Sequence, residues 1–120
     1  MSQPDMSKIH PIFIQQGELL AKRDLDGLMD LYHPDAVFVR FQRVASGKKE
    51  IREVLEKYIA LQLEFVALEE YVDTGETIMM RSTMKVEGET ETSCATLVLR
   101  DGKIWRQAAA REGGARDWGF

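Results

Sequence analysis

Hydrophobic residues in the first half of the chain recur every three or four positions, which is the spacing of one face of an α-helix. One such stretch begins near residue 7, a second follows Asp24 and stops at Pro34, and a third opens after Gly47. Asp24 is typical of a helix N-cap, and the residue before a proline is disfavoured in the helical conformation. The pattern therefore predicts three N-terminal helices.

The second half of the chain alternates hydrophobic and polar residues, which is typical of β-strands. Turn signals rich in glycine and aspartate divide it into four strands, near residues 63–72, 77–86, 90–100 and 103–111. Connections this short require antiparallel neighbours, because a parallel pair needs a long crossover. One more strand is predicted at residues 36–41, between the second and third helices, since AVFVRF is rich in β-branched and aromatic residues.

These elements predict an α+β fold, in which three N-terminal helices pack against a curved antiparallel sheet. Long twisted strands tend to curl, and helices on the open side would close the curl into a cone around a small-molecule-sized pocket. Met80 and Met84 would lie on the inward face of the second of the four strands. Because no repeat or linker divides the chain, we expect one domain, with a core at about residues 7–111 and a loose, glycine-rich tail at 112–120.

Charge and composition exclude several classes of protein. The net charge is −4 with acidic and basic residues interspersed, whereas a nucleic-acid-binding protein needs a basic patch. Cys94 is the only cysteine, so no intramolecular disulfide can form. No apolar run approaches the roughly 20 residues of a membrane span, and no signal-peptide pattern is present, so a cytoplasmic protein without membrane contact is expected. His10 and His33 are far apart, and no cluster has metal-ligand spacing, so neither a metal nor another cofactor is expected.

Two segments of the chain resemble the nuclear transport factor 2-like superfamily, whose members include ketosteroid isomerases and SnoaL-like polyketide cyclases. These segments are DLDGLMDLYHPDAVFV at residues 24–39 and GKKEIREV at residues 47–54. The order of elements extends the resemblance over about residues 7–111. It implies a cystatin-like α+β barrel with a pocket in its cone. It implies no single activity, because the superfamily includes isomerases, cyclases, dehydratases, epoxide hydrolases and plain binding proteins.

The resemblance places the functional positions of the isomerases on different residues in this chain. The position of their proton-shuttling aspartate falls on Arg40, and that of their oxyanion-hole tyrosine on Gln16. The position of a second oxyanion-hole acid falls near Ala95, while Tyr32 matches a tyrosine of the isomerase pocket. The resemblance therefore implies that this chain is not a ketosteroid isomerase, since it lacks their general base.

Arg40 and Glu70 are the candidate catalytic residues. Arg40 shares a strand face with Phe38 and either forms an internal salt bridge with Glu69 or Glu70, or holds a carboxylate, phenolate or enolate oxygen of a ligand. If Glu70 faces inward beside Leu68, apolar walls would raise its pKa toward the range of a general base. The alternative is that Glu70 is the counter-ion of Arg40.

The remaining candidates would bind substrate in the pocket. Gln16 lies on an otherwise apolar helix face, where it would hydrogen-bond either the backbone or a ligand. The full set of substrate-binding candidates is Gln16, Tyr32, Phe38, Tyr58, Met80, Met84, Trp105 and Gln107. These candidates fit two functions. In the first, the chain is a cofactor-independent isomerase, cyclase or lyase that acts on a hydrophobic carbonyl- or carboxylate-bearing metabolite. The alternative is a non-catalytic ligand-binding or dimerisation module.

The outer face of the sheet is expected to form a homodimer. It would carry Met79, Arg81, Thr83, Thr96 and Val98, which is too mixed for a core and too apolar for plain contact with solvent.

Overall fold

The computed structural model describes residues 6–111, and within them it contains three α-helices. They are α1 (Pro11–Lys22), α2 (Leu25–Asp30) and α3 (Gly47–Ala60), preceded by a short 3-10 helix at Met6–Lys8. α1 begins with Pro11, whose missing amide hydrogen costs nothing at this position. The Asp24 side chain accepts a hydrogen bond from the Gly27 amide and caps α2, as the sequence predicts. The tail at 112–120 lies outside the described residues.

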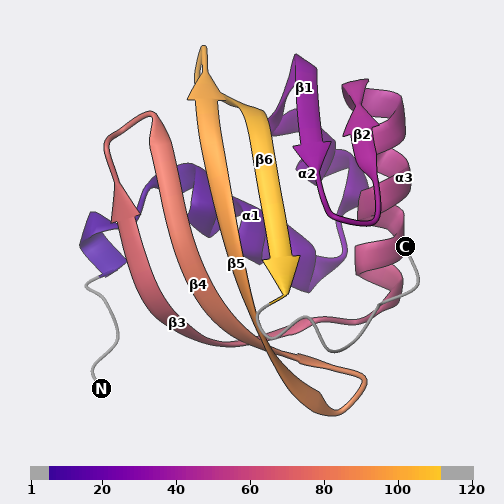
Figure 1. Cartoon of the computed structure of the whole chain (residues 1–120), viewed down its shortest axis with the longest axis vertical. Helices are drawn as coiled ribbons and strands as arrows, with labels where there is room; N and C mark the ends of the chain where they lie inside the picture. The colour runs from indigo at the N-terminus through magenta and orange to yellow at the C-terminus, as the bar shows by residue number, and fades with distance from the viewer. Residues whose placement is uncertain (1–5, 112–120) are drawn as a thin grey trace.

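The described residues also form one sheet of six strands, in the order β2-β1-β6-β5-β4-β3. The sheet is curved and unclosed, and the helices cover its concave side (Figure 1). The four long antiparallel strands and the α+β class are both confirmed. The strands are β1 (Tyr32–Val39), β2 (Val44–Ser46), β3 (Glu64–Asp73), β4 (Thr77–Val86), β5 (Glu89–Arg100) and β6 (Lys103–Arg111).

The first strand departs from the sequence-based prediction in two ways. β1 begins at Tyr32 rather than at residue 36, and it pairs in parallel with β6, so the sheet is mixed and not antiparallel throughout. Pro34 lies in β1 where the pairing with β6 is irregular, between Tyr32 and Val37, and there its missing amide hydrogen breaks no ladder bond. The short strand β2, which pairs with β1 through a tight turn, was not predicted.

The inner face of the sheet carries the core, together with residues of all three helices. β4 shows the predicted alternation: Ile78, Met80 and Ser82 are buried, while Met79 between them is 56% exposed. Leu28, Ile51, Leu68, Leu97 and Ile104 complete the centre of the core. Within residues 6–111, no helix is long and apolar enough to cross a membrane.

Irregularities in pairing shift the inward face of two strands. In β3 the register shifts twice, so Phe65, Leu68 and Tyr71 point toward the helices at intervals of three residues rather than two. In β6 Trp105 is an extra residue, because Leu99 pairs with Ile104 while Val98 pairs with Arg106. These two shifts decide which candidate residues reach the interior.

Candidate functional site

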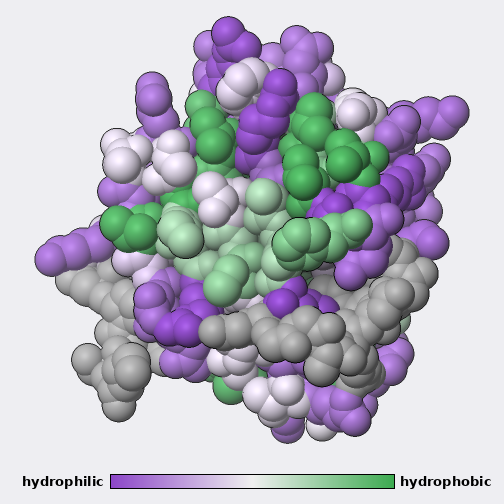
Figure 2. Space-filling model, in the orientation of Figure 1, coloured by the Kyte–Doolittle hydropathy of each residue, from purple (hydrophilic) through white to green (hydrophobic). Residues whose placement is uncertain are grey.

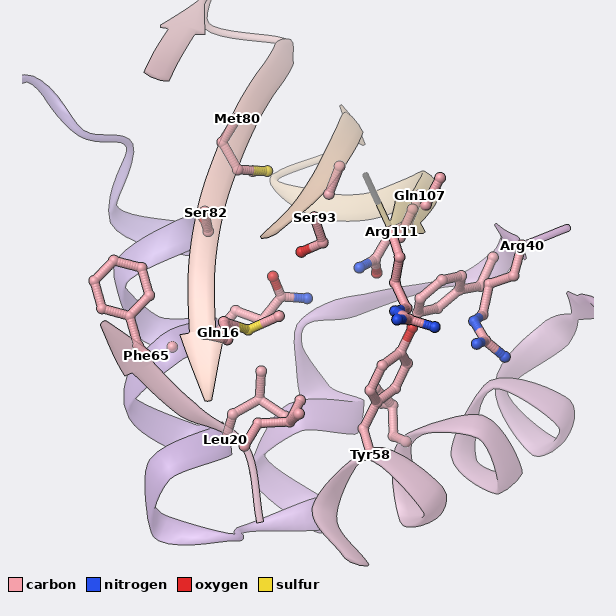
Figure 3. Close-up of a pocket in the computed structure, with 18 of the residues that line it drawn as sticks. Gln16, Leu20, Arg40, Tyr58, Phe65, Met80, Ser82, Ser93, Gln107 and Arg111 are labelled. Carbon is pink, nitrogen blue, oxygen red and sulfur yellow. The ribbon is translucent and has the colours of Figure 1, made fainter. Parts of the chain in front are cut away.

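A cavity of about 390 Å³ lies between the inner face of the sheet, α1 and α3. Most of its lining side chains are apolar, and two polar places lie among them (Figure 3). Two aromatic residues on its border are largely exposed, Phe41 at 91% and Phe65 at 59%. This volume falls within the range of sites that hold small organic molecules.

The first polar place is a chain of hydrogen bonds that joins two glutamines through Tyr32. Gln16 on α1 donates from Nε2 to the Tyr32 hydroxyl at 3.2 Å, and that hydroxyl donates to Oε1 of Gln107 on β6. Both glutamines line the cavity, whereas Tyr32 is 1% exposed and lies behind them. Burial raises the pKa of Tyr32 well above its ordinary value, so this hydroxyl keeps its proton.

The second polar place is formed by Arg40 and Tyr58. Arg40 directly follows β1, where two backbone hydrogen bonds with Arg43 close the tight turn to β2. Its side chain is buried with Phe38 on the inward face, as the sequence predicts, and its Cζ lies 5.4 Å from the centre of the Tyr58 ring. Burial raises the pKa of Tyr58, while the charge of Arg40 and its hydrogen bond to the phenol lower it.

Arg111 is a cavity residue that was not singled out from the sequence. It lies at the end of β6, on the same side of the strand as Gln107, so the alternation of β6 was the signal that could have identified it. Its Nη2 atom lies 2.9 Å from Oε2 of Glu91, and both side chains are largely buried. Figure 3 shows the Arg111 guanidinium on the same side of the cavity as Tyr58 and Arg40. Ser82 and Ser93, which pair across β4 and β5, also line the cavity and were not predicted.

Three expected site residues do not line the cavity: Tyr32, which lies behind the two glutamines, and Glu70 and Trp105, which are turned away from it. Glu70 is exposed and forms an ion pair with Arg81, because the register shift between Leu68 and Glu70 turns it to the outer face. Glu69 accepts a hydrogen bond from Thr83, so the observed partners of both glutamates are residues other than Arg40. Trp105 is also turned away by its bulge, and two arginines flank its ring.

The other substrate-binding candidates do line the cavity. Gln16, Phe38, Tyr58, Met80, Met84 and Gln107 all border it. Its described lining contains no aspartate or glutamate. Within residues 6–111, no group of three His, Cys, Asp or Glu side chains could hold a metal ion. The chemistry offered by this lining is therefore cationic and hydrogen-bonding rather than acidic.

Comparisons with known proteins agree with this architecture. Residues 15–107 match the SnoaL-like domain family. A proposed polyketide cyclase from Sinorhizobium meliloti is 18% identical, with a TM-score of 0.78 over 88% of this chain and 99% of that one. A proposed ketosteroid isomerase from Kribbella flavida is 12% identical, with a TM-score of 0.75 over 88% and 78%.

A bacterial protein with a cystatin-like fold, from Silicibacter pomeroyi, is 17% identical, with a TM-score of 0.71 over 87% of this chain and 75% of that one. At these identities the solved structures establish the fold alone. None of the curated proteins matches this chain.

Proposed function

The chain belongs to the SnoaL-like domain family of the nuclear transport factor 2-like superfamily, and from this premise we propose that its cavity binds and converts a hydrophobic metabolite. The metabolite carries a carbonyl or carboxylate group, and the reaction is an isomerisation, cyclisation or elimination that uses neither a metal nor a redox cofactor. The protein is accordingly an isomerase, cyclase or lyase of a kind other than ketosteroid isomerase.

The observation that carries this proposal is a buried arginine on an apolar cavity. Arg40 is 7% exposed, and a guanidinium remains charged at any ordinary pH. In a site shielded from water, such a charge stabilises negative charge that develops on a carbonyl oxygen. Because a guanidinium only donates hydrogen bonds, the oxygen of Tyr58 is the acceptor in their contact, and the phenol proton is directed elsewhere.

The proton transfer is assigned to the substrate, since the described lining holds no carboxylate. In a cyclisation, the carbon next to one carbonyl gives its proton to a basic oxygen of the same molecule. The resulting enolate, held by Arg40, forms a bond to a second carbonyl carbon. The oxygen of that second carbonyl then takes up the proton, so the reaction needs no outside reagent.

Replacement of Arg40 by Met tests the role of the charge, because Met keeps an unbranched apolar side chain and removes the guanidinium. Thermal-shift measurements with 2-naphthoate and with naphthalene should show that R40M loses the naphthoate response and retains the naphthalene response. The melting temperature of R40M should lie within a few degrees of the original. The matched control is R43M, since Arg43 forms a surface ion pair with Glu53, 2.7 Å away. An unchanged naphthoate response in R40M contradicts the proposal.

A non-catalytic binding module is the second candidate, favoured by the lack of a carboxylate in the described lining. The two functions differ in one measurement. NMR can follow exchange for deuterium, in heavy water, of the methylene protons next to the ketone of 4-(2-naphthyl)-4-oxobutanoate, whose carboxylate supplies the basic oxygen of the same molecule. Acceleration by the protein, lost in R40M, supports catalysis by enolisation. Binding without acceleration supports the module.

We also propose a homodimer through the outer sheet face. Figure 2, which views the molecule from the side of the sheet away from the helices, shows apolar side chains gathered over the middle strands. Val39, Val72 and Met79 on this side are 43%, 62% and 56% exposed. A shallow groove beside them is lined by small residues of β5 and β6, including Cys94, Ala108 and Ala110. A second copy of the chain fits such a flat apolar surface, because self-association would cover it on both partners.

A further inference from the structure

Three buried polar side chains face the cavity with hydrogen-bonding capacity that no described residue uses. Gln16 and Gln107 are each 8% exposed, and Ser82 is 7% exposed. Each glutamine uses one end of its amide to bind Tyr32. Within residues 6–111, the carbonyl oxygen of Gln16, the amino group of Gln107 and the Ser82 hydroxyl have no further partner. These three groups border the cavity, where a bound molecule can supply the missing hydrogen bonds.

The chain of hydrogen bonds through Tyr32 has a direction, and that direction can reverse. As it stands, Gln16 donates to the hydroxyl and the hydroxyl donates to Gln107, so the cavity meets an acceptor on Gln16 and a donor on Gln107. If both amides turn by half a rotation and the hydroxyl hydrogen moves to its other side, every bond is kept. The cavity then meets a donor on Gln16 and an acceptor on Gln107. The oxygen and nitrogen of an amide are nearly equal in size, so the packing does not change.

Reversal is inexpensive because all three groups are uncharged. The raised pKa of Tyr32 keeps its hydroxyl protonated, and an amide carries no charge in either orientation. Ser82 adds a hydroxyl that can also donate or accept. By contrast, Arg40 and Arg111 only donate, so these two cavity residues have a fixed preference for an acceptor.

We propose, resting on the function inferred above, that Gln16, Tyr32 and Gln107 form a reversible neutral hydrogen-bonding wall that recognises both the keto and the enol form of a hydrophobic ligand. A ketone oxygen accepts a hydrogen bond and an enol or phenol also donates one. A wall with fixed donors would bind the oxygen of both forms but would leave the hydroxyl hydrogen of the enol without an acceptor. A wall that reverses holds the ligand oxygen before and after the transfer. The substrate class is therefore a hydrophobic ketone that enolises within the cavity.

Three probes with one skeleton test the wall by isothermal titration calorimetry: naphthalene, 2-naphthol and 2-acetylnaphthalene. Naphthol donates and accepts, acetylnaphthalene accepts only, and naphthalene does neither. We expect both oxygen-bearing probes to bind about 3- to 10-fold more tightly than naphthalene, since one hydrogen bond contributes about that factor. Equal affinity of all three probes overturns the inference and leaves the proposed function standing. If none of the probes binds, the proposed function fails as well.

Two variants locate the effect. In the double variant Gln16→Met and Gln107→Met, both oxygen-bearing probes should lose most of their advantage over naphthalene, with naphthalene unchanged and any remaining advantage due to Arg40, Arg111 and Ser82. In Gln107→Glu, an ionised carboxylate accepts from Tyr32 and presents a second acceptor to the cavity. Its advantage for acetylnaphthalene should then fall as the pH is raised from about 5 to about 8, through the titration of the new carboxyl, while its advantage for naphthol remains.

The matched control is Gln15→Glu, the same change one residue away on the exposed side of α1. It should leave all three affinities independent of pH, as in the original protein. If the double variant does not fold, the pH dependence of probe affinity in Gln107→Glu is sufficient to test the wall. Acetylnaphthalene affinity that is flat with pH in Gln107→Glu contradicts the wall.

Discussion

At the scale of single residues, loss of the Tyr32 hydroxyl affects two other buried side chains. Its hydroxyl serves two buried amides at once. We expect Tyr32→Phe to lower the free energy of unfolding by about 1–3 kcal/mol, because removal of one oxygen leaves two buried polar ends unsatisfied. Urea unfolding measures this change. A loss below about 0.5 kcal/mol contradicts the burial of the chain of hydrogen bonds.

Tyr71 makes the stability of the protein sensitive to alkaline pH. Its hydroxyl accepts from the His10 amide at 2.8 Å and donates to Oδ2 of Asp73 at 2.6 Å. Burial, followed by the hydrogen bond to Asp73, raises the pKa of Tyr71 to about 12. The folded state thus holds this proton more tightly than the unfolded chain, whose tyrosine pKa is about 10.

The contribution of Tyr71 to stability is therefore complete below about pH 10 and is lost as the pH rises toward about 12. Urea unfolding should be measured at about pH 9, below this range, and at about pH 11, inside it. Between these two values the free energy of unfolding should fall less for Tyr71→Phe than for the original protein. Some fall remains in the variant, because the pKa values of Tyr32 and Tyr58 are raised too. Equal falls in both proteins rule out the contribution of Tyr71.

At the scale of elements, regular spacing was predictable and its interruptions were not. The helix faces and the alternation of β4 follow from periods of 3.6 and 2 residues, and they placed Gln16, Met80 and Met84 correctly on the cavity. The bulges of β3 and β6 carry no sequence signal of that kind. Each adds a residue to one strand, and so the inward predictions for Glu70 and Trp105 were wrong.

The position of Arg40 at the cavity depends on the alternation of side chains along β1 and on the pairing of β1 with a strand far away in the sequence. Its face of β1 is set by alternation with Ala36 and Phe38, which the sequence contains. Its position at the cavity also needs β6 as a parallel neighbour, and that pairing joins segments about 70 residues apart in the chain. Turn signals predict pairing between consecutive strands only. They therefore predicted neither β2 nor the parallel pairing of β1 with β6.

Two helical glycines differ in what their replacement by alanine would meet. A Cβ atom at Gly27 would lie 2.7 Å from the Asp24 carboxylate that caps α2, and 2.7 Å from a methyl group of Leu19. A Cβ atom at Gly17 in α1 would meet nothing within 4 Å. We expect Gly17→Ala to raise the free energy of unfolding by about 0.5–1 kcal/mol and Gly27→Ala to lower it by about 1 kcal/mol, through disruption of the cap. Thermal unfolding of both variants checks the opposite signs, and a gain for Gly27→Ala contradicts the tight contact.

At the scale of the whole molecule, the proposed dimer gives a direct test of the outer sheet face. Light scattering should give the original protein twice its chain mass of 13.7 kDa. Met79→Glu places a charge in the middle of the proposed interface and should raise the dissociation constant at least about 10-fold, since burying an unpaired charge is costly. Thr74→Glu, in the exposed turn between β3 and β4, is the matched control and should remain dimeric. A 13.7 kDa species for the original protein rules out the dimer.

The parallel pairing of β1 with β6 also governs when the cavity can exist. β1 is synthesised early, yet its neighbour β6 ends at Arg111, the last of the described residues. During translation, β2 and α3 can pack against β1 as soon as they emerge, but the edge of β1 that pairs with β6 stays uncovered until almost the whole described chain has left the ribosome. Contacts between such distant segments slow folding, because the intervening chain must be closed into a loop first. Because the first strand lies beside the last, the sheet cannot be completed strand by strand as the chain is synthesised. The uncovered edge of β1 is therefore briefly exposed to chaperones.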